Sequence, residues 1–448
     1  MYPLKPCIGI LMISADHSLF SIEEGNLLRS SDPPQLQEEQ FRRLLQHLQH
    51  AKNSRYYSRI FKDKNIILED LRSVKDLRSL PFTDRVDLGR YNDEFIADNI
   101  SIRDISHTSG TTGEPVVVPY TAHDLKRLAF NEAIAFYGAG LRAEDRILLT
   151  VTLDRCFIAG LAYYTGAIFL GASAIRSGPG QPAQQWNCIT KFKPTVLLGV
   201  PSFLLALARW GTANGYDCRK TSITSIVTIG EPIRNGDLEL TSLGKLLHEK
   251  WGVPIYSSYG ATEIETAFGD CCHCRGGHVH PELMIVEIID NEGNILPDNS
   301  AGEVVVTPLG VEGLPLVRFK TGDIARLHTK PCPCGWKTSR LGPIEGRLSQ
   351  RLKYKGTTLY PEMIFEALQQ LPTIDDSYIE IRQSFDLADE ITVVIGTNDT
   401  SINVVTIRNL LLSNLRVTPE VILKKSAEVS EKTGKGKLRK PQRFFDHR

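Results

Sequence analysis

The sequence predicts an α/β protein with a large N-terminal domain, residues 1–346, and a small C-terminal α+β lid domain, residues 347–448. Its 448 residues exceed what one hydrophobic core usually holds, so two or more domains are expected. Between about residues 120 and 260, short apolar runs alternate with helical segments, which is typical of βαβ units and of helices layered on a mostly parallel sheet. After residue 280 strands dominate, which indicates a β-rich subdomain within the large domain.

Hydrophobic spacing predicts the elements of the large domain. Phe41, Leu44 and Leu48 recur at helical spacing, so we expect one helix over residues 34–61. An apolar run at residues 7–13 is expected to form a buried strand. The same reasoning predicts strands at 146–151, 195–199, 226–229 and 253–257, and helices at 184–192, 201–214 and 237–250.

The region after residue 280 is expected to begin with a hairpin. A turn at 291–294 joins the apolar run 284–290 to Ile295, and residues 302–307 continue the strands. A domain boundary is expected near residues 346–352. Beyond that boundary, the pattern predicts strands at 377–381 and 391–395 and helices at 361–371 and 401–415.

Charge and cysteine content limit the class of protein. Lys plus Arg and Asp plus Glu both number 52, so the formal net charge is zero, which argues against nucleic acid or an anionic membrane as a partner. The apolar run near the N-terminus is too short to span a bilayer and lacks the features of a signal peptide. The nine cysteines, several of them clustered, indicate a metal site in a reducing cytoplasm rather than disulfides.

A loop of hydroxyls and glycines at residues 107–115 carries the strongest functional signal. Its Ser, Thr and Gly residues let successive N–H groups face one point and add rotatable donors, which suits phosphate oxygens. The loop is not a Walker motif, because its glycine spacing is shorter and no lysine follows. A β-branched run at 116–118 predicts a strand after it. A nucleotide triphosphate is the expected ligand, and a plain Ser/Thr turn is the alternative.

Polar side chains follow further predicted strands. The segment Tyr256–Glu263 offers an aromatic ring for a base, a threonine for phosphate and a carboxylate for Mg²⁺. Asp323 follows a tight turn, where it can accept both ribose hydroxyls, and Glu231 also follows a strand. Strand ends are where open α/β sheets bind ligands. Seen alone, each segment is also compatible with an ordinary turn.

Taken together and in this order, these segments resemble the acyl-adenylating superfamily of acyl-CoA synthetases, luciferases and adenylation domains, and within it the phenylacetate–CoA ligase branch. The resemblance covers nearly the whole chain. It implies three catalytic residues: Glu263, which would hold Mg²⁺, Arg347 at the hinge, and Lys435 on the lid, with Lys437 as a rival for the same role. The nucleotide-binding residues that it implies are Thr108, Ser109, Gly110, Thr111, Thr112, Gly113, Glu231, Tyr259, Gly260, Thr262 and Asp323.

The sequence departs from the family pattern at three positions. Glu114 stands where the phosphate loop usually carries lysine, and Ser349 stands where the hinge usually has Asp or Lys. Ile229 enlarges a position that is usually small. Because Ser349 lies at the hinge, this difference could alter how the lid rotates, although serine can still serve as a pivot.

The resemblance implies an ATP-dependent acid–thiol ligase. Such an enzyme would activate a small carboxylic acid, aryl or arylacetic, as an acyl-adenylate with release of pyrophosphate, and would then pass the acyl group to coenzyme A. Transfer to the phosphopantetheine thiol of a carrier protein stays open, as does a homodimer. A different interpretation is that the chain is not an enzyme but a non-catalytic protein that binds a nucleotide or an acyl-adenylate.

A cluster of soft ligands predicts a structural Zn²⁺ site at Cys271, His278, Cys332 and Cys334. The branch named above includes members with a similar Cys…His…Cys-x-Cys site, and the step from Cys271 to His278 fits that version. Four protein ligands leave no open coordination position, so we expect the ion to fix the scaffold rather than to act in catalysis. A cysteine-rich loop without metal is the alternative. Four neighbouring residues could replace one of these ligands: Cys272, Cys274, His273 and His280.

Overall fold

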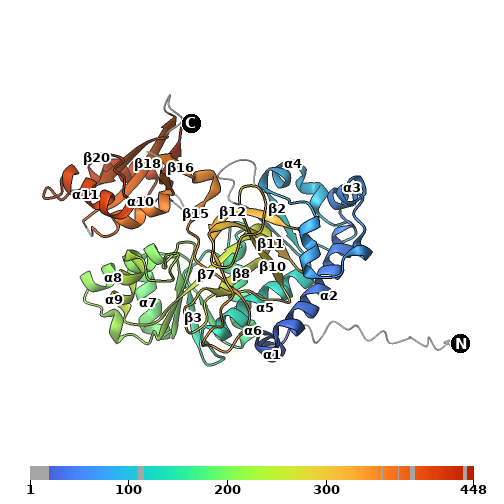
Figure 1. The fold of residues 1–448 in the computed structure, drawn as a ribbon. Helices are drawn as coiled ribbons and strands as arrows, with labels where there is room; N and C mark the ends of the chain where they lie inside the picture. The colour runs from blue at the N-terminus through green and yellow to red at the C-terminus, as the bar shows by residue number, and fades with distance from the viewer. Residues whose placement is uncertain (1–19, 109–115, 355–356, 372, 384–388, 437–440) are drawn as a thin grey trace, which may run out of the picture.

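The computed structural model describes residues 20–108, 116–354, 357–371, 373–383, 389–436 and 441–448. Figure 1 shows the elements up to β15 as the larger part, with the segment from β16 to the C-terminus packed beside and above it. The predicted strand at 7–13, the loop residues 109–115 and Lys437 lie outside the described residues. None of the helices in these ranges combines the length and apolar composition that a bilayer crossing requires.

A six-stranded sheet forms the centre of the larger part, in the order β4-β3-β5-β6-β7-β8. All neighbouring pairs are parallel except β7 and β8, which run antiparallel. The predicted parallel sheet is therefore confirmed. Its strands are β3 (Arg146–Leu149), β4 (Ser173–Arg176), β5 (Val196–Gly199), β6 (Ser225–Ile229), β7 (Ile255–Ala261) and β8 (Thr266–Gly269).

Helices cover both faces of this sheet because its strands are apolar on both faces. Leu149 and Leu198 enter the core shared with α5 and α6, whereas Leu148 and Leu197 enter the core of α7, α8 and α9. Alternate residues of one strand thus belong to different cores, which explains the continuous apolar runs in the sequence. The helices are α5 (Ala122–Gly138), α6 (Ile158–Leu170), α7 (Pro182–Phe192), α8 (Pro201–Ala213) and α9 (Ser242–Trp251).

Antiparallel strands follow, as the sequence predicts. A four-stranded sheet joins β10 (Met284–Ile289), β11 (Gly302–Pro308), β12 (Phe319–Ala325) and β15 (Gly346–Arg347) in that order. A smaller sheet joins β13 (Leu327–His328), β14 (Arg340–Leu341) and β9 (Gly277–His278). The hairpin of β1 (Asp104–His107) and β2 (Val117–Tyr120) flanks the predicted phosphate loop. The helices that precede it are α1 (Ile22–Ser30), α2 (Pro33–Ala51), α3 (Arg55–Asp63) and α4 (Arg85–Phe95).

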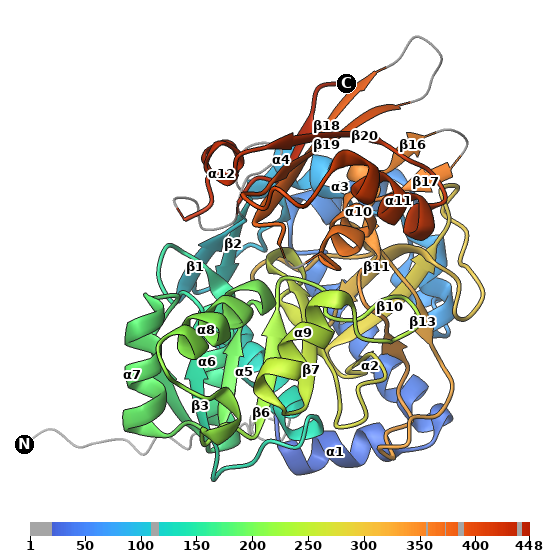
Figure 2. The ribbon, with the colours of Figure 1, turned by 90° about the vertical axis from the view of Figure 1, so that its left-hand side faces the viewer.

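The C-terminal part has its own sheet, in the order β20-β19-β18-β21, and its own core. Buried side chains such as Ile379, Val393 and Leu411 fill this core. In Figure 2 this part lies across the top of the molecule, and α10 contacts α9. Its elements are β16 (Leu352–Tyr354), β17 (Thr357–Leu359), α10 (Pro361–Leu368), β18 (Asp376–Gln383), β19 (Asp389–Gly396), α11 (Val404–Leu415), β20 (Glu420–Lys424), α12 (Ser426–Thr433) and β21 (Phe444–Asp446).

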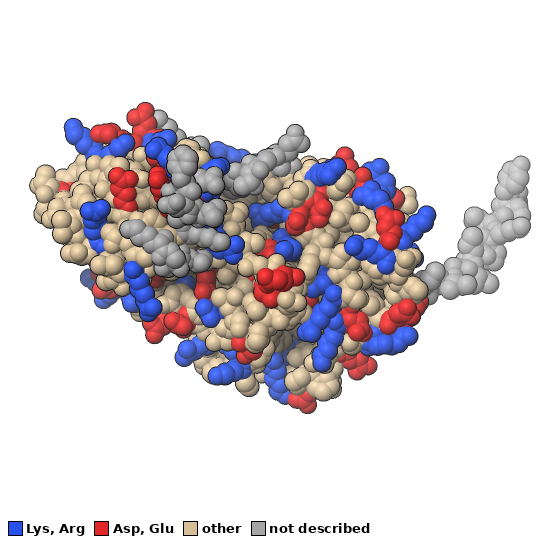
Figure 3. Space-filling model, turned by 45° about the horizontal axis from the view of Figure 1, so that its top comes forward, with Lys and Arg blue, Asp and Glu red and all other residues tan. Residues whose placement is uncertain are grey.

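Charged side chains are spread over the surface. Figure 3 shows Lys and Arg interspersed with Asp and Glu on the face that it presents, in keeping with the balanced composition. Such mixing leaves no single sign of charge dominant on that face.

Two helix predictions are wrong in their boundaries. The single helix expected over 34–61 is two helices, α2 and α3, because the Ser54 hydroxyl accepts the Tyr57 amide at 3.3 Å and caps a new helix. The helix expected at 237–250 begins only at Ser242, where Thr241 is the cap and accepts the Gly244 amide at 3.2 Å. Strand β7 is longer than predicted, so Tyr259 lies within a strand rather than after one.

A buried carboxyl group makes the stability of the fold depend on pH. Glu132 lies on α5 against α6, and burial raises its pKa from 4.5 to about 8. The folded chain therefore keeps this proton up to about pH 8, whereas the unfolded chain releases it near pH 4.5. Because the folded state binds more protons in this window, Glu132 makes stability fall as the pH rises through it.

The substitution Glu132→Gln is expected to remove this loss of folding stability at higher pH. The variant should gain stability relative to the parent at pH 8 but not at pH 5, as measured by urea unfolding at both values. Glu38→Gln, on the exposed face of α2, is the matched control and should leave the pH dependence unchanged. An identical pH dependence in the parent and Glu132→Gln would contradict the assignment.

Candidate active site

Three of the predicted residues meet where strands β7, β12 and β15 lie together. The Tyr259 hydroxyl donates to Asp323 Oδ2 at 2.8 Å, and Arg347 Nε lies 3.1 Å from Asp323 Oδ1. Asp323 and Arg347 are direct partners across β12 and β15. The tight turn predicted before Asp323 is not a turn, because Gly322 and Asp323 lie inside β12; Gly322 adopts a left-handed φ of 74° there, where the pairing of β11 with β12 shifts register. The structure thus brings an aromatic ring, a buried carboxylate and a guanidinium into one network.

The surroundings keep the Tyr259 phenol protonated. Burial and the adjacent Asp323 carboxylate raise the pKa of Tyr259 well above its ordinary value. The ring itself stacks on Phe268, with ring centroids 5.8 Å apart and planes at 20°. Tyr259 therefore acts as a hydrogen-bond donor to Asp323 while its ring is held in a fixed orientation by β8.

Glu263 lies in the short 3₁₀ helix Thr262–Ile264 that follows β7. Its carboxylate is buried, and Arg85 Nη2 approaches its Oε1 to 3.3 Å. Arg85 is the first residue of α4 and was not singled out from the sequence. A divalent cation at Glu263 would share that carboxylate with a guanidinium.

The remaining predicted nucleotide residues occupy separate positions. The Thr108 amide donates to the Val116 carbonyl at 3.0 Å, and the Thr108 hydroxyl accepts the Val116 amide at 3.1 Å. These two bonds close the base of the predicted phosphate loop. Glu231 accepts the Ser202 amide and hydroxyl at 3.0 and 2.9 Å, so it caps the first turn of α8. Gly260 is exposed at the end of β7.

The predicted catalytic lysine lies in the C-terminal part, just after α12. Lys435 is exposed, and its ammonium group donates to the backbone carbonyl of Asp375. This contact stays within the C-terminal part, so the structure does not bring Lys435 to Asp323 or Glu263. Ser349, the unusual hinge residue, lies in a short 3₁₀ helix directly after β15.

Four predicted metal ligands converge. The ligand atoms of Cys271, His278, Cys332 and Cys334 all lie within 4.8 Å of one another. Cys271 Sγ and Cys332 Sγ are 3.6 Å apart, and Cys334 Sγ lies 3.4 Å from His278 Nε2. His278 Nδ1 is 2.8 Å from the Thr338 hydroxyl, which leaves Nε2 to face the sulfurs. Three sulfurs and one imidazole nitrogen, oriented in this way, fit a tetrahedral Zn²⁺ site.

The substitute ligands lie outside this cluster. Cys272 and His273 are exposed, and Cys274 Sγ contacts the Ile255 carbonyl at 3.6 Å. His280 faces Arg29, with Arg29 Nη2 2.7 Å from its Nδ1. The candidate metal ligands are therefore the four predicted residues, Cys271, His278, Cys332 and Cys334. They bring together the loop after β8, strand β9 and the loop before β14.

Open α/β sheets bind their ligands outside the carboxyl ends of the strands, and the Tyr259–Asp323 pair lies near that end of β7. The model of the AMP-binding enzyme family matches residues 44–311, and the chain belongs to that family. The chain is therefore an enzyme of the AMP-forming acid–CoA ligase group, and the resemblance drawn from its motifs is confirmed.

Known proteins agree with this assignment. The chain is 30% identical to a phenylacetate-coenzyme A ligase of Thermus thermophilus, over 77% of this chain and 76% of that protein. It is 28% identical to a phenylacetate-coenzyme A ligase of Escherichia coli, over 84% of this chain and 85% of that protein. A crystal structure of 2-hydroxyisobutyryl-CoA ligase in the postadenylation state, with 2-HIB-AMP, superimposes with a TM-score of 0.79 at 21% identity, over 91% of this chain and 89% of that one. This last likeness shows the fold.

Proposed function

We propose that the chain activates an aryl or arylacetic acid with ATP and transfers the acyl group to coenzyme A. In the first step, an oxygen of the substrate carboxylate bonds to the α-phosphorus and the bond to pyrophosphate breaks. In the second, the thiol sulfur bonds to the acyl carbon, loses its proton, and AMP leaves. The observation that carries the proposal is the contact of Tyr259 and Arg347 with the buried Asp323 carboxylate.

The proposed roles follow from the chemistry of each group. Asp323 accepts the ribose hydroxyls, and Tyr259 lies against the adenine. Residues 108–113 hold the phosphates of the leaving pyrophosphate. Glu263 would hold Mg²⁺, which supplies positive charge to the phosphates. Because its Oε1 is shared with Arg85, that guanidinium is a further positive group beside the same carboxylate.

The C-terminal part is proposed to act as a mobile lid over residues 347–448. Its separate core permits rigid-body rotation, and Arg347 with Ser349 lies at the junction. Rotation would carry Lys435 to the reacting groups, where its ammonium stabilises charge on the α-phosphate and the substrate carboxylate. A carrier-protein thiol in place of coenzyme A is the alternative acceptor.

We also propose that Cys271, His278, Cys332 and Cys334 bind a structural Zn²⁺. Support comes from the mutual approach of their ligand atoms and from the Thr338 contact that orients His278. The ion would tie the loop after β8 to the strands that follow Asp323, and so stiffen the scaffold around the nucleotide site.

The acyl group is proposed to lie along the start of α6, beside the end of β7. Phe157 and Tyr164 are half-buried there, and Arg176 lies over the Tyr164 ring at 5.4 Å from its centroid. Tyr163 is buried and donates to the Ser258 hydroxyl at 3.1 Å, so it packs in the core beneath this region. Half-buried rings suit an aromatic acid better than a short aliphatic one.

Acid-dependent ATP–pyrophosphate exchange tests this function. We expect exchange with arylacetic acids to exceed exchange with short aliphatic acids by about tenfold or more, because an apolar pocket discriminates by the area it buries. Reactions without acid and reactions without enzyme are the controls. Binding of ATP with no exchange for any acid in the panel would contradict the proposal and favour a non-catalytic nucleotide-binding protein.

A further inference from the structure

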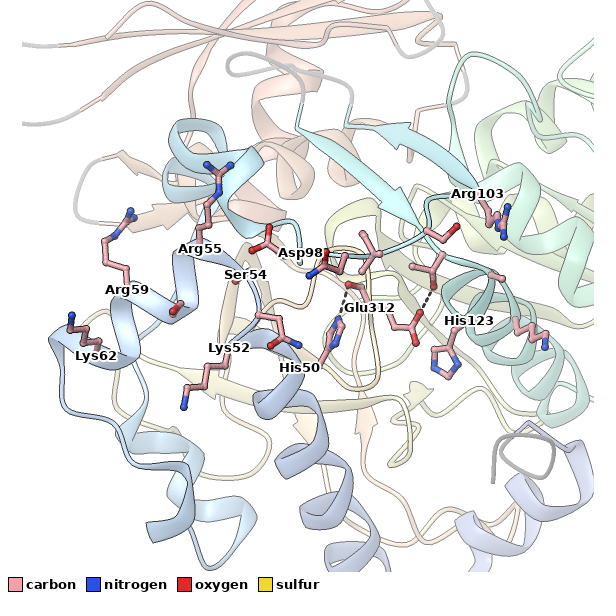
Figure 4. Close-up of a pocket in the computed structure, with 18 of the residues that line it drawn as sticks. His50, Lys52, Ser54, Arg55, Arg59, Lys62, Asp98, Arg103, His123 and Glu312 are labelled. Carbon is pink, nitrogen blue, oxygen red and sulfur yellow. Dashed lines mark hydrogen bonds between the residues drawn. The ribbon is translucent and has the colours of Figure 1, made fainter. Parts of the chain in front are cut away.

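A large groove lies on the side of the molecule formed by α3 and the start of α5. Its volume is about 1210 Å³, and its walls come from the end of α2, from α3, from residues 98–103 and from the first turn of α5. Figure 4 shows Arg55, Arg59 and Lys62 on one side of the groove and Arg103 and His123 on the other. No residue of the proposed adenylation site lines it.

The groove concentrates positive charge in a chain whose formal net charge is zero. Three Asp or Glu side chains line it, namely Asp63, Asp98 and Glu312, and they are outnumbered by basic ones. The basic side chains are Lys52, Arg55, Arg59, Lys62, Arg103 and Lys126. A concave surface with an excess of one sign of charge attracts ligands of the opposite sign.

Most of these cations have no acidic partner among the described residues. Arg59 pairs with Glu94, and Arg55 donates to the Asp93 carbonyl at 3.3 Å. No ion pair is formed by Lys52, Lys62, Arg103 or Lys126 within the described part of the chain. The carboxylates of Asp63, Asp98 and Glu312 only partly offset the six basic groups around this hollow, so a bound anion would relieve their mutual repulsion.

The floor of the groove is fixed by hydrogen bonds. His50 Nε2 lies 2.9 Å from the Glu312 carbonyl, and the Thr121 hydroxyl donates to Glu312 Oε2 at 2.6 Å. The buried Asp124 carboxylate accepts the amides of Glu312 and Gly313 at 2.8 and 3.0 Å. The acidic floor residue is thus already engaged, and a ligand would meet a preformed surface.

The groove lies at one end of the β1–β2 hairpin and the predicted phosphate loop at the other. Ser101 and Arg103 line the groove just before β1, and the Arg103 amide donates to the Tyr120 carbonyl at 2.7 Å. Thr108 and Val116 close the loop base at the opposite end of the same hairpin. An occupant of the groove therefore contacts the hairpin without entering the adenylation site.

We infer that this groove binds a small anion that carries several phosphoryl groups. Cations on two facing walls suit a ligand whose negative charges are spread over a molecule of nucleotide size, whereas a protein surface would meet only the rim. Two candidate ligands carry such phosphoryl groups: the nucleotide end of coenzyme A and a separate phosphorylated effector. The site is distinct from the one that binds the triphosphate for adenylation.

Calorimetric titration of the full chain with inorganic tripolyphosphate, without added magnesium, tests the inference. The variant Lys52→Gln/Lys126→Gln should bind the probe at least about tenfold more weakly than the parent, because two charge-assisted contacts are lost. Both side chains are exposed, so the thermal unfolding midpoint should not change. Lys191→Gln/Lys250→Gln removes the same charge from exposed positions outside the groove and is the matched control.

Competition identifies the source of the phosphates. If coenzyme A displaces tripolyphosphate from the parent but not from a chain lacking the groove lysines, the occupant is the nucleotide end of coenzyme A. If tripolyphosphate stays bound in excess coenzyme A and the groove variant still loses it, the occupant is a separate effector. Equal affinity of the parent and the groove variant for tripolyphosphate, or no binding to either, would overturn the inference.

Discussion

Replacing Lys435 with alanine is expected to lower acid-dependent ATP–pyrophosphate exchange by about 100- to 1000-fold, the usual cost of removing one group that stabilises charge in the transition state. In the structure this lysine is exposed and its ammonium group donates to the backbone carbonyl of Asp375, so its truncation should leave the fold intact. Its charge is needed only when the lid brings it to the α-phosphate. The KM for ATP should therefore change less than kcat.

Two neighbouring lysines serve as comparisons for Lys435. Lys432 is exposed at the end of α12, with its ammonium 4.6 Å from the centroid of the Phe445 ring, and Lys432→Ala should exchange at close to the parent rate. Lys437→Ala decides between the two candidate lysines, because only one of them should be required. A Lys435→Ala variant that exchanged as fast as the parent would refute the assignment.

The parallel sheet could be predicted because local pattern and tertiary packing agree there. Leu148 and Leu197 face one core, and their neighbours Leu149 and Leu198 face another. Such strands must be apolar at every position, so they stand out as short continuous runs between amphipathic helices. Apolar runs also predict the C-terminal strands β18 and β19, although these two strands follow one another directly and pair antiparallel.

Helix boundaries depend on side-chain contacts that periodicity does not carry. Leu48 on α2 and Phe61 on α3 belong to the same core, so the apolar spacing continues across the break between the two helices. What ends one helix and starts the next is the Ser54 cap, a single hydroxyl among many in the chain. Thr241 decides the start of α9 in the same way.

The candidate site was partly predictable for a related reason. Tyr259 and Asp323 stand beside apolar runs and glycines that the sequence makes recognisable, and the structure places them in contact, although both lie inside strands rather than after them. Arg85 was missed because its partner Glu263 is distant in sequence and no local pattern joins α4 to the end of β7. Nor could spacing choose among Cys271, Cys272 and Cys274, since neighbouring residues in a turn point in different directions.

The cysteine cluster carries the second large expected effect. Cys271→Ser should reduce bound zinc from about one ion per chain to near zero, because it removes one of four ligands from a buried site. Ion loss should lower the thermal unfolding midpoint by about 5–10 °C, since a structural metal contributes several kcal/mol to folding. Metal content by mass spectrometry and thermal unfolding of the same preparations measure both effects.

Cys272→Ser provides a matched comparison, because it makes the same chemical change at the adjacent residue. Cys272 is exposed and lies outside the four-residue cluster, so this variant should keep its zinc and its unfolding midpoint. Exchange activity should follow metal content, because the cluster ties the loop after β8 to the strands that follow Asp323. Zinc retained by Cys271→Ser but lost by Cys272→Ser would show that the other cysteine is the ligand. A parent protein purified with no metal and full stability would remove the structural role altogether.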